Sequence, residues 1–127
     1  FGLMQLLPER AKELADEAEV EYKDFNDLYE PDKNIKLGTL LLSRYLTKWK
    51  YNFIGYIASY NAGSGAINRW LKSRYRKDPF EFVEMIPYEE TQGYIKLIFR
   101  NYVTYLRLTG NDVAVDPQFL WNSKVKL

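Results

Sequence analysis

The sequence predicts an all-α fold, and three observations support this prediction. Apolar residues recur at spacings of three and four along most of the chain, as they do on one face of a helix. Proline and glycine fall where periodic segments start or stop, as at Pro8, Gly63 and Gly110. No stretch alternates convincingly between apolar and polar residues, which is the pattern of a strand. The 127 residues suit a single domain.

The first predicted helix begins at Pro8, because proline is well placed in the first turn of a helix. Residues 22–32 are acidic, aromatic and interrupted by Pro31, so we interpret them as a loop with a short turn. The apolar stripe of the first helix consists of Leu7, Ala11, Leu14, Ala15 and Ala18.

Asn34 is the predicted cap of a second helix, and Gly38 within that helix allows another helix to approach closely. A third helix, about residues 52–60, is apolar on most sides and should lie centrally in the core. The stripe of the second helix consists of Leu37, Leu41, Tyr45, Leu46 and Trp49.

Gly63 ends the third helix in a left-handed conformation, and Ser64 is the predicted cap of the next one. That fourth helix carries Ile67, Trp70 and Leu71 on its apolar face.

Pro79 begins a short helix, closed by Pro87, and Thr91 is the predicted cap of a long helix that ends at 110–111. Residues 113–127 form a tail with little pattern, although its aromatic and aliphatic residues must pack somewhere or bind a partner. The short helix carries Phe80, Val83 and Glu84, the long helix carries Tyr94, Ile95, Ile98, Tyr102, Tyr105 and Leu106, and the tail carries Phe119, Leu120 and Trp121.

Composition excludes several classes of function. The formal net charge is only +1, which argues against strong electrostatic capture of nucleic acid. The one dense basic segment, residues 72–77, is either a charged helix end or a contact for an anionic wall polymer. The chain has no cysteine and no histidine, so disulfides, thiol catalysis, the common zinc sites and Ser–His triads are excluded. Acid–base chemistry would fall to Asp, Glu, Tyr or Lys.

No apolar run approaches the roughly 18 residues needed to span a bilayer, and no signal peptide is present in this chain. Absence of cysteine fits a reducing or an oxidising compartment equally well.

Three short motifs combine features that could bind a polar ligand: residues 2–5 (Gly-Leu-Met-Gln), 60–63 (Tyr-Asn-Ala-Gly) and 86–91 (Ile-Pro-Tyr-Glu-Glu-Thr). Taken singly, each has an ordinary structural interpretation. A lone glutamine such as Gln5 is commonly a structural hydrogen-bonding group. The glycines at 63–65 explain a helix end, and adjacent glutamates at a helix start complement its dipole.

Taken together and in this order, the three motifs resemble the soluble Slt-type lytic transglycosylases, the SLT domain of the lysozyme-like superfamily. The resemblance implies an all-α, lysozyme-like (goose-type lysozyme/SLT) helical domain. It implies a bacterial lyase that cuts the β-1,4 bond between MurNAc and GlcNAc in peptidoglycan and leaves 1,6-anhydroMurNAc. It also implies a set of substrate-binding residues: Gln5, Leu7, Tyr60, Asn61, Glu90 and Tyr94.

In the resembled family one glutamate acts as acid and then as base, and its position would fall before Phe1. We therefore expect residues 1–127 to be a single SLT-like domain that lacks its N-terminal helix, has no catalytic residue of its own, and is inactive alone. An N-terminal segment of the same protein is then a possible partner. The resemblance implies glycan strands as ligand, no metal or cofactor, and a periplasmic or cell-envelope location. Within the chain, Glu84 is the least trivial alternative acid, because it falls in an apolar segment.

Other functions remain open on the sequence alone. The chain could be a non-catalytic glycan-binding module that keeps the cleft without the acid, or a lysozyme-like hydrolase. A helical interaction domain without a role in sugar binding is a third alternative, for which the tail residues 119–121 give some support.

Overall fold

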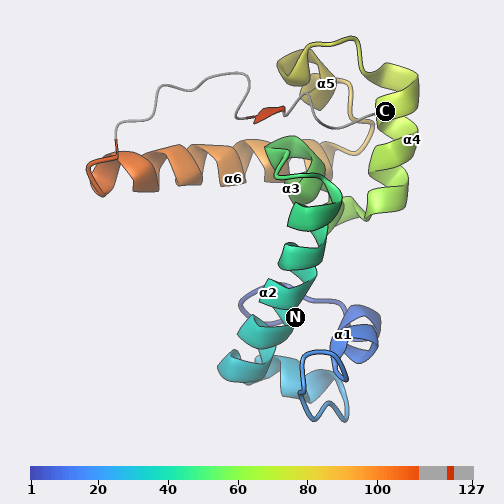
Figure 1. Cartoon of the computed structure of the whole chain (residues 1–127), viewed down its shortest axis with the longest axis vertical. Coiled ribbons are helices and arrows are strands. Elements are labelled where there is room, and N and C mark those ends of the chain that lie inside the picture. The colour runs from blue at the N-terminus through green and yellow to red at the C-terminus, as the bar shows by residue number, and fades with distance from the viewer. Residues whose placement is uncertain (112–119, 122–127) are drawn as a thin grey trace. The chain divides into compact units, whose positions relative to one another are not determined.

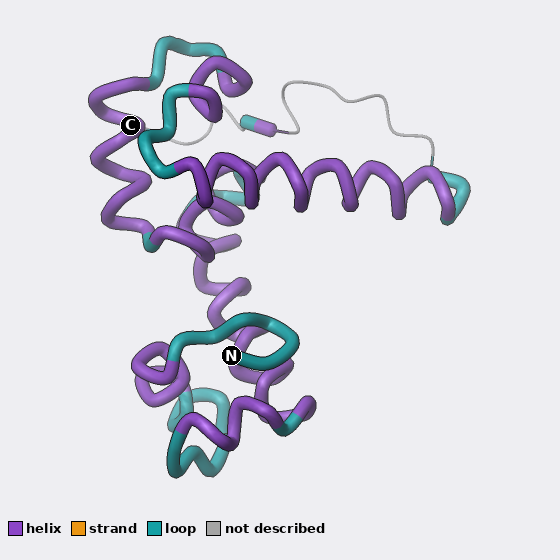
Figure 2. Tube along the Cα trace, turned by 180° about the vertical axis from the view of Figure 1, so that it is seen from behind, coloured by secondary structure: helices purple, strands orange, loops and turns teal. Residues whose placement is uncertain are grey.

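The computed structural model describes residues 1–111 and 120–121, and within them every regular element is helical, as Figure 2 shows. The prediction of an all-α fold is confirmed. The chain divides into two compact units, residues 1–44 and 45–127. The prediction of a single domain stays a prediction, and each unit is described by itself.

The first unit contains helix α1 (Pro8–Leu14), the 3₁₀ helix η1 (Phe25–Tyr29) and most of α2 (Pro31–Lys48). Pro8 stands in the first turn of α1, as predicted. Leu7, in contrast, precedes the helix and is exposed, so it does not belong to the buried stripe. The core of this unit consists of Leu6, Ala11, Leu14, Ala15, Ala18, Leu28, Leu37 and Leu41.

The segment between α1 and α2 is more ordered than the predicted loop. The Asp24 carboxylate accepts from the backbone N–H of Asn26, and the Asp27 carboxylate accepts from the N–H of Asp24. This reciprocal capping box begins η1. Helix α2 then starts at Pro31, three residues before the predicted cap.

The prediction that Asn34 caps a helix is wrong. Asn34 lies inside the first turns of α2 and is fully buried, with its side chain turned towards the N-terminal segment. The role predicted for Gly38 is also wrong, because the group that approaches it is the side chain of Met4, not a helix. A Cβ at Gly38 would lie 2.5 Å from the Cβ of Met4.

In the described part of the second unit, the end of α2 is followed by the helices labelled in Figure 1: α3 (Phe53–Ala62), α4 (Ser64–Arg74), α5 (Pro79–Glu84) and α6 (Glu89–Leu108). Helix α3 packs against both α4 and α6, so it occupies the centre of this unit, as its apolar sequence predicts. The buried core consists of Trp49, Phe53, Ile54, Ile57, Ala58, Ala66, Ile67, Trp70, Leu71, Phe82, Val83, Ile86, Ile95 and Leu120.

Two residues of the predicted tail fall within the described part of the chain, and both pack. Leu120 is buried in the core of the second unit, and Trp121 stacks on Tyr75 with ring centroids 4.5 Å apart. Phe119 and the rest of residues 113–127 lie outside the described residues.

The structure tests the helix caps that the sequence predicted for the second unit, at Gly63, Ser64 and Thr91. Gly63 ends α3, as predicted, and its N–H donates to the carbonyl of Ser59. Its φ of +81° is positive, which favours glycine, but its ψ of 144° differs from that of the predicted left-handed helical cap. Ser64 does not cap α4, because Gly63 occupies the cap position and the Ser64 hydroxyl instead accepts from Lys48 Nζ at 2.8 Å. Thr91 does not cap α6 either, since the helix begins at Glu89. None of the described helices is long and apolar enough to span a membrane.

Candidate functional site

The Gly-Leu-Met-Gln motif of the first unit is a tight loop held by Asn34. The Asn34 Oδ1 accepts from the backbone N–H of Met4 at 2.7 Å. Its Nδ2 donates to the carbonyls of Phe1 at 3.0 Å and Leu28 at 2.9 Å. A buried amide that makes all three bonds fixes the path of the loop, because each group would otherwise lose its partner away from water.

Glycine at position 2 is required by this arrangement. Gly2 has φ +67°, and a Cβ there would lie 2.2 Å from the carbonyl oxygen of Leu28 and 2.3 Å from Nδ2 of Asn34. Both the conformation and the close approach exclude any larger residue. Because Gly2 has no side chain, the GLMQ loop can lie directly against Asn34, which holds it in place.

The loop separates its side chains into two sets. Leu6 is buried and Met4 packs on Gly38, whereas Gln5 and Leu7 are exposed. Gln5 adopts φ +51°, which is uncommon for a residue with a side chain, and its Nε2 donates to the carbonyl of Gly2 at 2.7 Å. Both predicted ligand residues of this unit are thus available to solvent.

In the second unit, a buried contact fixes the helix that bears Tyr60 and Asn61. The indole N–H of Trp49 donates to the Ser59 hydroxyl at 2.7 Å, and both residues are buried. The Trp49 ring lies directly on Gly55, where a Cβ would approach the indole to 2.7 Å. Helix α3 is thereby held at its last turn as well as at its start.

Asn61 is tied to α6 across the helix pair. The Thr91 hydroxyl donates to Asn61 Oδ1 at 2.7 Å, and Thr91 is 1% exposed. This bond uses Oδ1 of Asn61. It also fixes the orientation of the amide group, and therefore the direction in which Nδ2 can donate a hydrogen bond. Sequence reasoning missed this role of Thr91. The absence of Glu or Gln three residues later, where Tyr94 stands, was a signal against a capping box.

Tyr60 and Tyr94 lie close together at this helix pair. Burial, followed by the nearby Tyr94 and Tyr45 phenols, raises the pKa of Tyr60 to about 12. Burial also raises the pKa of Tyr94. Both phenols are therefore neutral at physiological pH and can donate a hydrogen bond as well as accept one.

Glu90 is exposed in the first turn of α6, one residue before Thr91. Its negative charge is favourable there because the N-terminal end of a helix dipole is positive. Glu89 shares this property, so the position alone does not separate the two glutamates. The described residues contain no group of three or more Asp or Glu side chains arranged to hold a metal ion.

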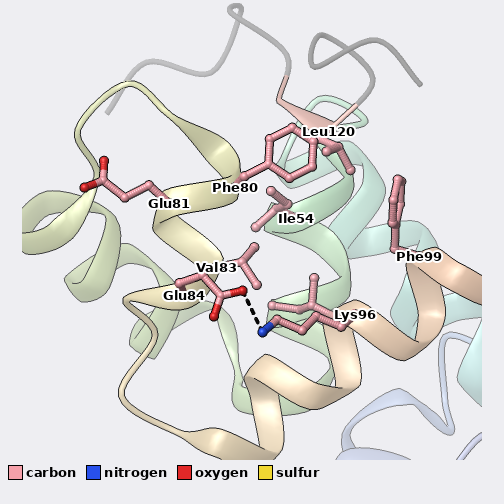
Figure 3. A pocket seen from close by; sticks show the side chains of 9 residues that line it. Ile54, Phe80, Glu81, Val83, Glu84, Lys96, Phe99 and Leu120 are labelled. Atoms are coloured by element: carbon pink, nitrogen blue, oxygen red, sulfur yellow. Dashed lines mark ion pairs between the residues drawn. The ribbon is translucent and has the colours of Figure 1, made fainter. Parts of the chain in front are cut away.

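Glu84, the alternative acid, lines a separate pocket of about 260 Å³ between α3, α5 and α6 (Figure 3). The walls are mostly apolar, but the Glu84 carboxylate is exposed and pairs with Lys96 Nζ at 2.6 Å. A solvated, ion-paired carboxylate lacks the apolar burial that a general acid needs near neutral pH.

The basic segment at residues 72–77 has structural partners for two of its charges. Arg74 donates to the carbonyl of Met85 at 3.3 Å, and Arg76 lies 3.9 Å from Glu81. These contacts fit the interpretation as a charged helix end, and contact with an anionic polymer stays a prediction.

The structure therefore assembles the predicted site residues in two local groups. Gln5 and Leu7 lie on the clamped loop of the first unit, and the rest lie at the α3–α6 pair of the second unit. Their convergence on one groove stays a prediction.

Comparison with known proteins gives consistent results. A family model described as the transglycosylase SLT domain matches residues 1–83. A Haemophilus influenzae protein assigned as a soluble lytic murein transglycosylase is 42% identical over 96 residues, which are 75% of this chain and 16% of that protein. The soluble lytic murein transglycosylase of Salmonella typhimurium is 34% identical over 125 residues, 97% of this chain and 19% of its own length.

Among solved structures, an inactive glutamate-to-glutamine variant of the lytic transglycosylase Slt from Pseudomonas aeruginosa matches with a TM-score of 0.77. The identity is 32%, over 88% of this chain and 18% of that chain. The present chain thus spans less than a fifth of the length of these relatives. The match of the family model over most of the chain identifies it as a member of the transglycosylase SLT domain family.

Proposed function

We propose that this chain belongs to a peptidoglycan lytic transglycosylase and supplies sugar-binding walls of its active site. The observation that carries the proposal is the family match across residues 1–83, which includes the clamped GLMQ loop and the Tyr60–Asn61 helix end. The pairing of that helix end with Thr91 and Tyr94 of α6 adds support, because it gathers phenol and amide groups suited to a polar ligand.

The proposed reaction uses one glutamate twice. As an acid, it protonates the glycosidic oxygen between MurNAc and GlcNAc while the bond to the anomeric carbon breaks. The acetamido group of the substrate stabilises the positive charge that develops on that carbon. As a base, the same carboxylate then removes the proton of the 6-hydroxyl, whose oxygen bonds to the anomeric carbon and closes the 1,6-anhydro ring. No water is consumed, and no metal or cofactor takes part.

We propose that this glutamate comes from a segment of the same protein outside the present chain. A residue with both roles needs a pKa raised by burial against apolar groups. Every glutamate in the chain is instead exposed. The inactivity of the glutamate-to-glutamine variant of the Pseudomonas aeruginosa relative supports an essential glutamate in the family.

The residues of this chain would then bind and orient the sugars. We assign to Tyr60 a hydrogen bond beside the catalytic carboxyl, since its phenol stays protonated at neutral pH. Asn61, held by Thr91, shapes the same corner. Glu90 accepts from the N–H of an N-acetyl group, and Tyr94 lines the cleft near it.

In the first unit, Gln5 presents its exposed amide to a sugar and Leu7 gives an apolar contact. Leu7 stands where the resembled family often has methionine, which is close to it in volume. The enzyme would act on the cell wall, in the periplasm or envelope.

The test is a product analysis with the full-length parent protein and purified peptidoglycan. Mass spectrometry should find muropeptides that end in 1,6-anhydroMurNAc, and Glu90→Gln and Tyr60→Phe should reduce their rate of formation. Reducing-end products would instead identify a lysozyme-like hydrolase. Retained binding to glycan strands without any cleavage would identify a non-catalytic glycan-binding module.

A further inference from the structure

Further tyrosines lie along α3 and α6, beyond the proposed sugar-binding residues. Helices α3 and α6 run in opposite directions along their contact, because Asn61 bonds to Thr91 near one end while Phe53 packs on Phe99 at the other. Along one face of α6, residues follow at spacings of four, four, four and three: Glu90, Tyr94, Ile98, Tyr102 and Tyr105. Such spacings place them on one side of a helix.

The part of this face around Tyr102 packs on a core residue. The Phe53 ring lies 6.1 Å from the ring of Tyr102 and 5.6 Å from that of Tyr56, measured between centroids. Phe53 itself is buried. The rings of Tyr56 and Tyr102 are therefore held in place by a core residue, and little entropy is lost when a ligand contacts them.

The two tyrosines that α6 contributes to this part of the face are too exposed to be explained by the core. Tyr105 is 69% exposed and Tyr102 is 39% exposed. A single exposed apolar residue needs no explanation, but adjoining aromatic rings on one face indicate a binding surface. Tyrosine presents an apolar ring with a polar tip, which suits contact with the C–H faces and hydroxyls of a pyranose.

The side chains of this surface are uncharged, which fits contact with the ring faces and hydroxyls of a glycan rather than with its lactyl carboxylates. Burial, followed by the nearby Tyr102, raises the pKa of Tyr56 to about 12, so its phenol is neutral under physiological conditions. Asn101, which directly precedes Tyr102 and is exposed, is also uncharged and can bond to hydroxyls. A strongly acidic or basic partner would find no complementary charge among these residues.

We infer that Tyr56, Tyr102 and Tyr105, here called the tyrosine seam, form a secondary glycan-binding surface that continues the cleft at Tyr60 and Tyr94. From Tyr94 to Tyr105 the helix advances about 16 Å, at 1.5 Å per residue, which is the length of several linked pyranose rings. A long glycan strand would reach the seam while a short fragment would occupy only the cleft. The inference rests on the proposed function, because it extends the same site.

The test compares long and short substrates in the full-length parent protein. Glycan strands freed of their stem peptides serve as the long substrate, and a tetrasaccharide of the same repeat serves as the short one. For Tyr105→Ala, kcat/KM on long strands relative to that on the tetrasaccharide should fall about tenfold, through KM. This factor corresponds to about 1.4 kcal/mol, within the range of one aromatic contact. Tyr105→Phe should keep most of the ratio, because the ring remains.

Thr104→Ala is the control, because Thr104 is an exposed residue of α6 that stands two residues after Tyr102 and one before Tyr105, and residues at such spacings do not face each other on a helix. Its ratio should equal that of the wild-type protein. An unchanged ratio in both Tyr105→Ala and Tyr102→Ala would overturn the inference while the proposed function stands. An equal fall in Thr104→Ala would also overturn it, because the effect would then not depend on the tyrosine face. If the wild-type protein forms no 1,6-anhydro product from either substrate, the proposed function itself fails.

Discussion

Replacing Asn34 by alanine tests whether the GLMQ loop depends on a single buried amide. The substitution removes three hydrogen bonds: those from Asn34 to the N–H of Met4 and to the carbonyls of Phe1 and Leu28. The Phe1 carbonyl still accepts from the N–H of Leu6 at 3.0 Å. At about 1 kcal/mol for each bond, we expect a loss of about 3 kcal/mol in the free energy of unfolding. Asn34 is fully buried, so water does not replace these bonds without rearrangement of the loop.

Urea denaturation monitored by tryptophan fluorescence and circular dichroism measures this loss. Asn26→Ala is the matched control, because Asn26 is exposed on η1 and its side chain should contribute within about 0.5 kcal/mol. Asn34→Asp should be at least as damaging as the alanine variant at neutral pH, since a carboxylate would face two carbonyl oxygens. A loss below about 1 kcal/mol for Asn34→Ala, with an unchanged denaturant slope, would refute the assignment of Asn34 as the clamp.

Three further predictions follow from single contacts. Gly55→Ala should destabilise the protein by about 1–3 kcal/mol in urea denaturation, because the added methyl meets the ring of Trp49; wild-type stability would contradict the packing. The Lys33 ammonium, then the Lys23 amide, hold the pKa of Asp27 at about 2, so the stability that Asp27 contributes is present above about pH 4 and lost as pH falls towards 2. Asp27→Asn should flatten that acid dependence, and an unaltered profile would count against the pair. Burial raises the pKa of Tyr60 to about 12, so the stability that its neutral phenol contributes is present below about pH 10 and lost as pH rises towards 12. Tyr60→Phe should reduce this loss of stability at alkaline pH, measured by urea unfolding at several pH values.

Helices were predictable here because their signals are local. Pro8 at the first turn of α1 and Gly63 at the end of α3 act through their own backbone conformations, and both mark the helix boundaries that were predicted. The apolar periodicity of α6 likewise gave its extent closely. The sequence also contained a better start for α2 than Asn34, namely Pro31 followed by Asp32, which suit the first turn of a helix.

The roles of polar residues were less predictable, because they depend on contacts between distant segments. Asn34 and Thr91 each have the residue type of a cap, yet each is buried inside a helix and bonds to another segment. Local signals argued against a cap at both positions, but they do not reveal the distant partner that each side chain binds. The same holds for the Trp49–Ser59 bond, which only packing reveals.

For the candidate site, the sequence motifs pointed to tyrosine and amide side chains, and the structure shows the contacts that hold them in place. The resemblance suggested Tyr60 and Asn61 as site residues without indicating that Thr91 ties Asn61 to α6. For Tyr105 the sequence left a position facing the cleft and a position in the core both open. It gave no indication of Tyr56 and Tyr102, because Tyr56 lies on α3 and meets Tyr102 only after the helices pack. Periodicity alone leaves such tyrosines indistinguishable from core residues.

The central claim is that Gln5, Tyr60 and Glu90 bind the same glycan. An NMR titration of the protein with a GlcNAc–MurNAc tetrasaccharide tests it most directly, through the backbone amide shifts of both units. We predict that the amides of Gln5, Tyr60 and Glu90 shift together and saturate at one ligand concentration. Shifts confined to one of the two units, or saturation at clearly different concentrations, would contradict the claim.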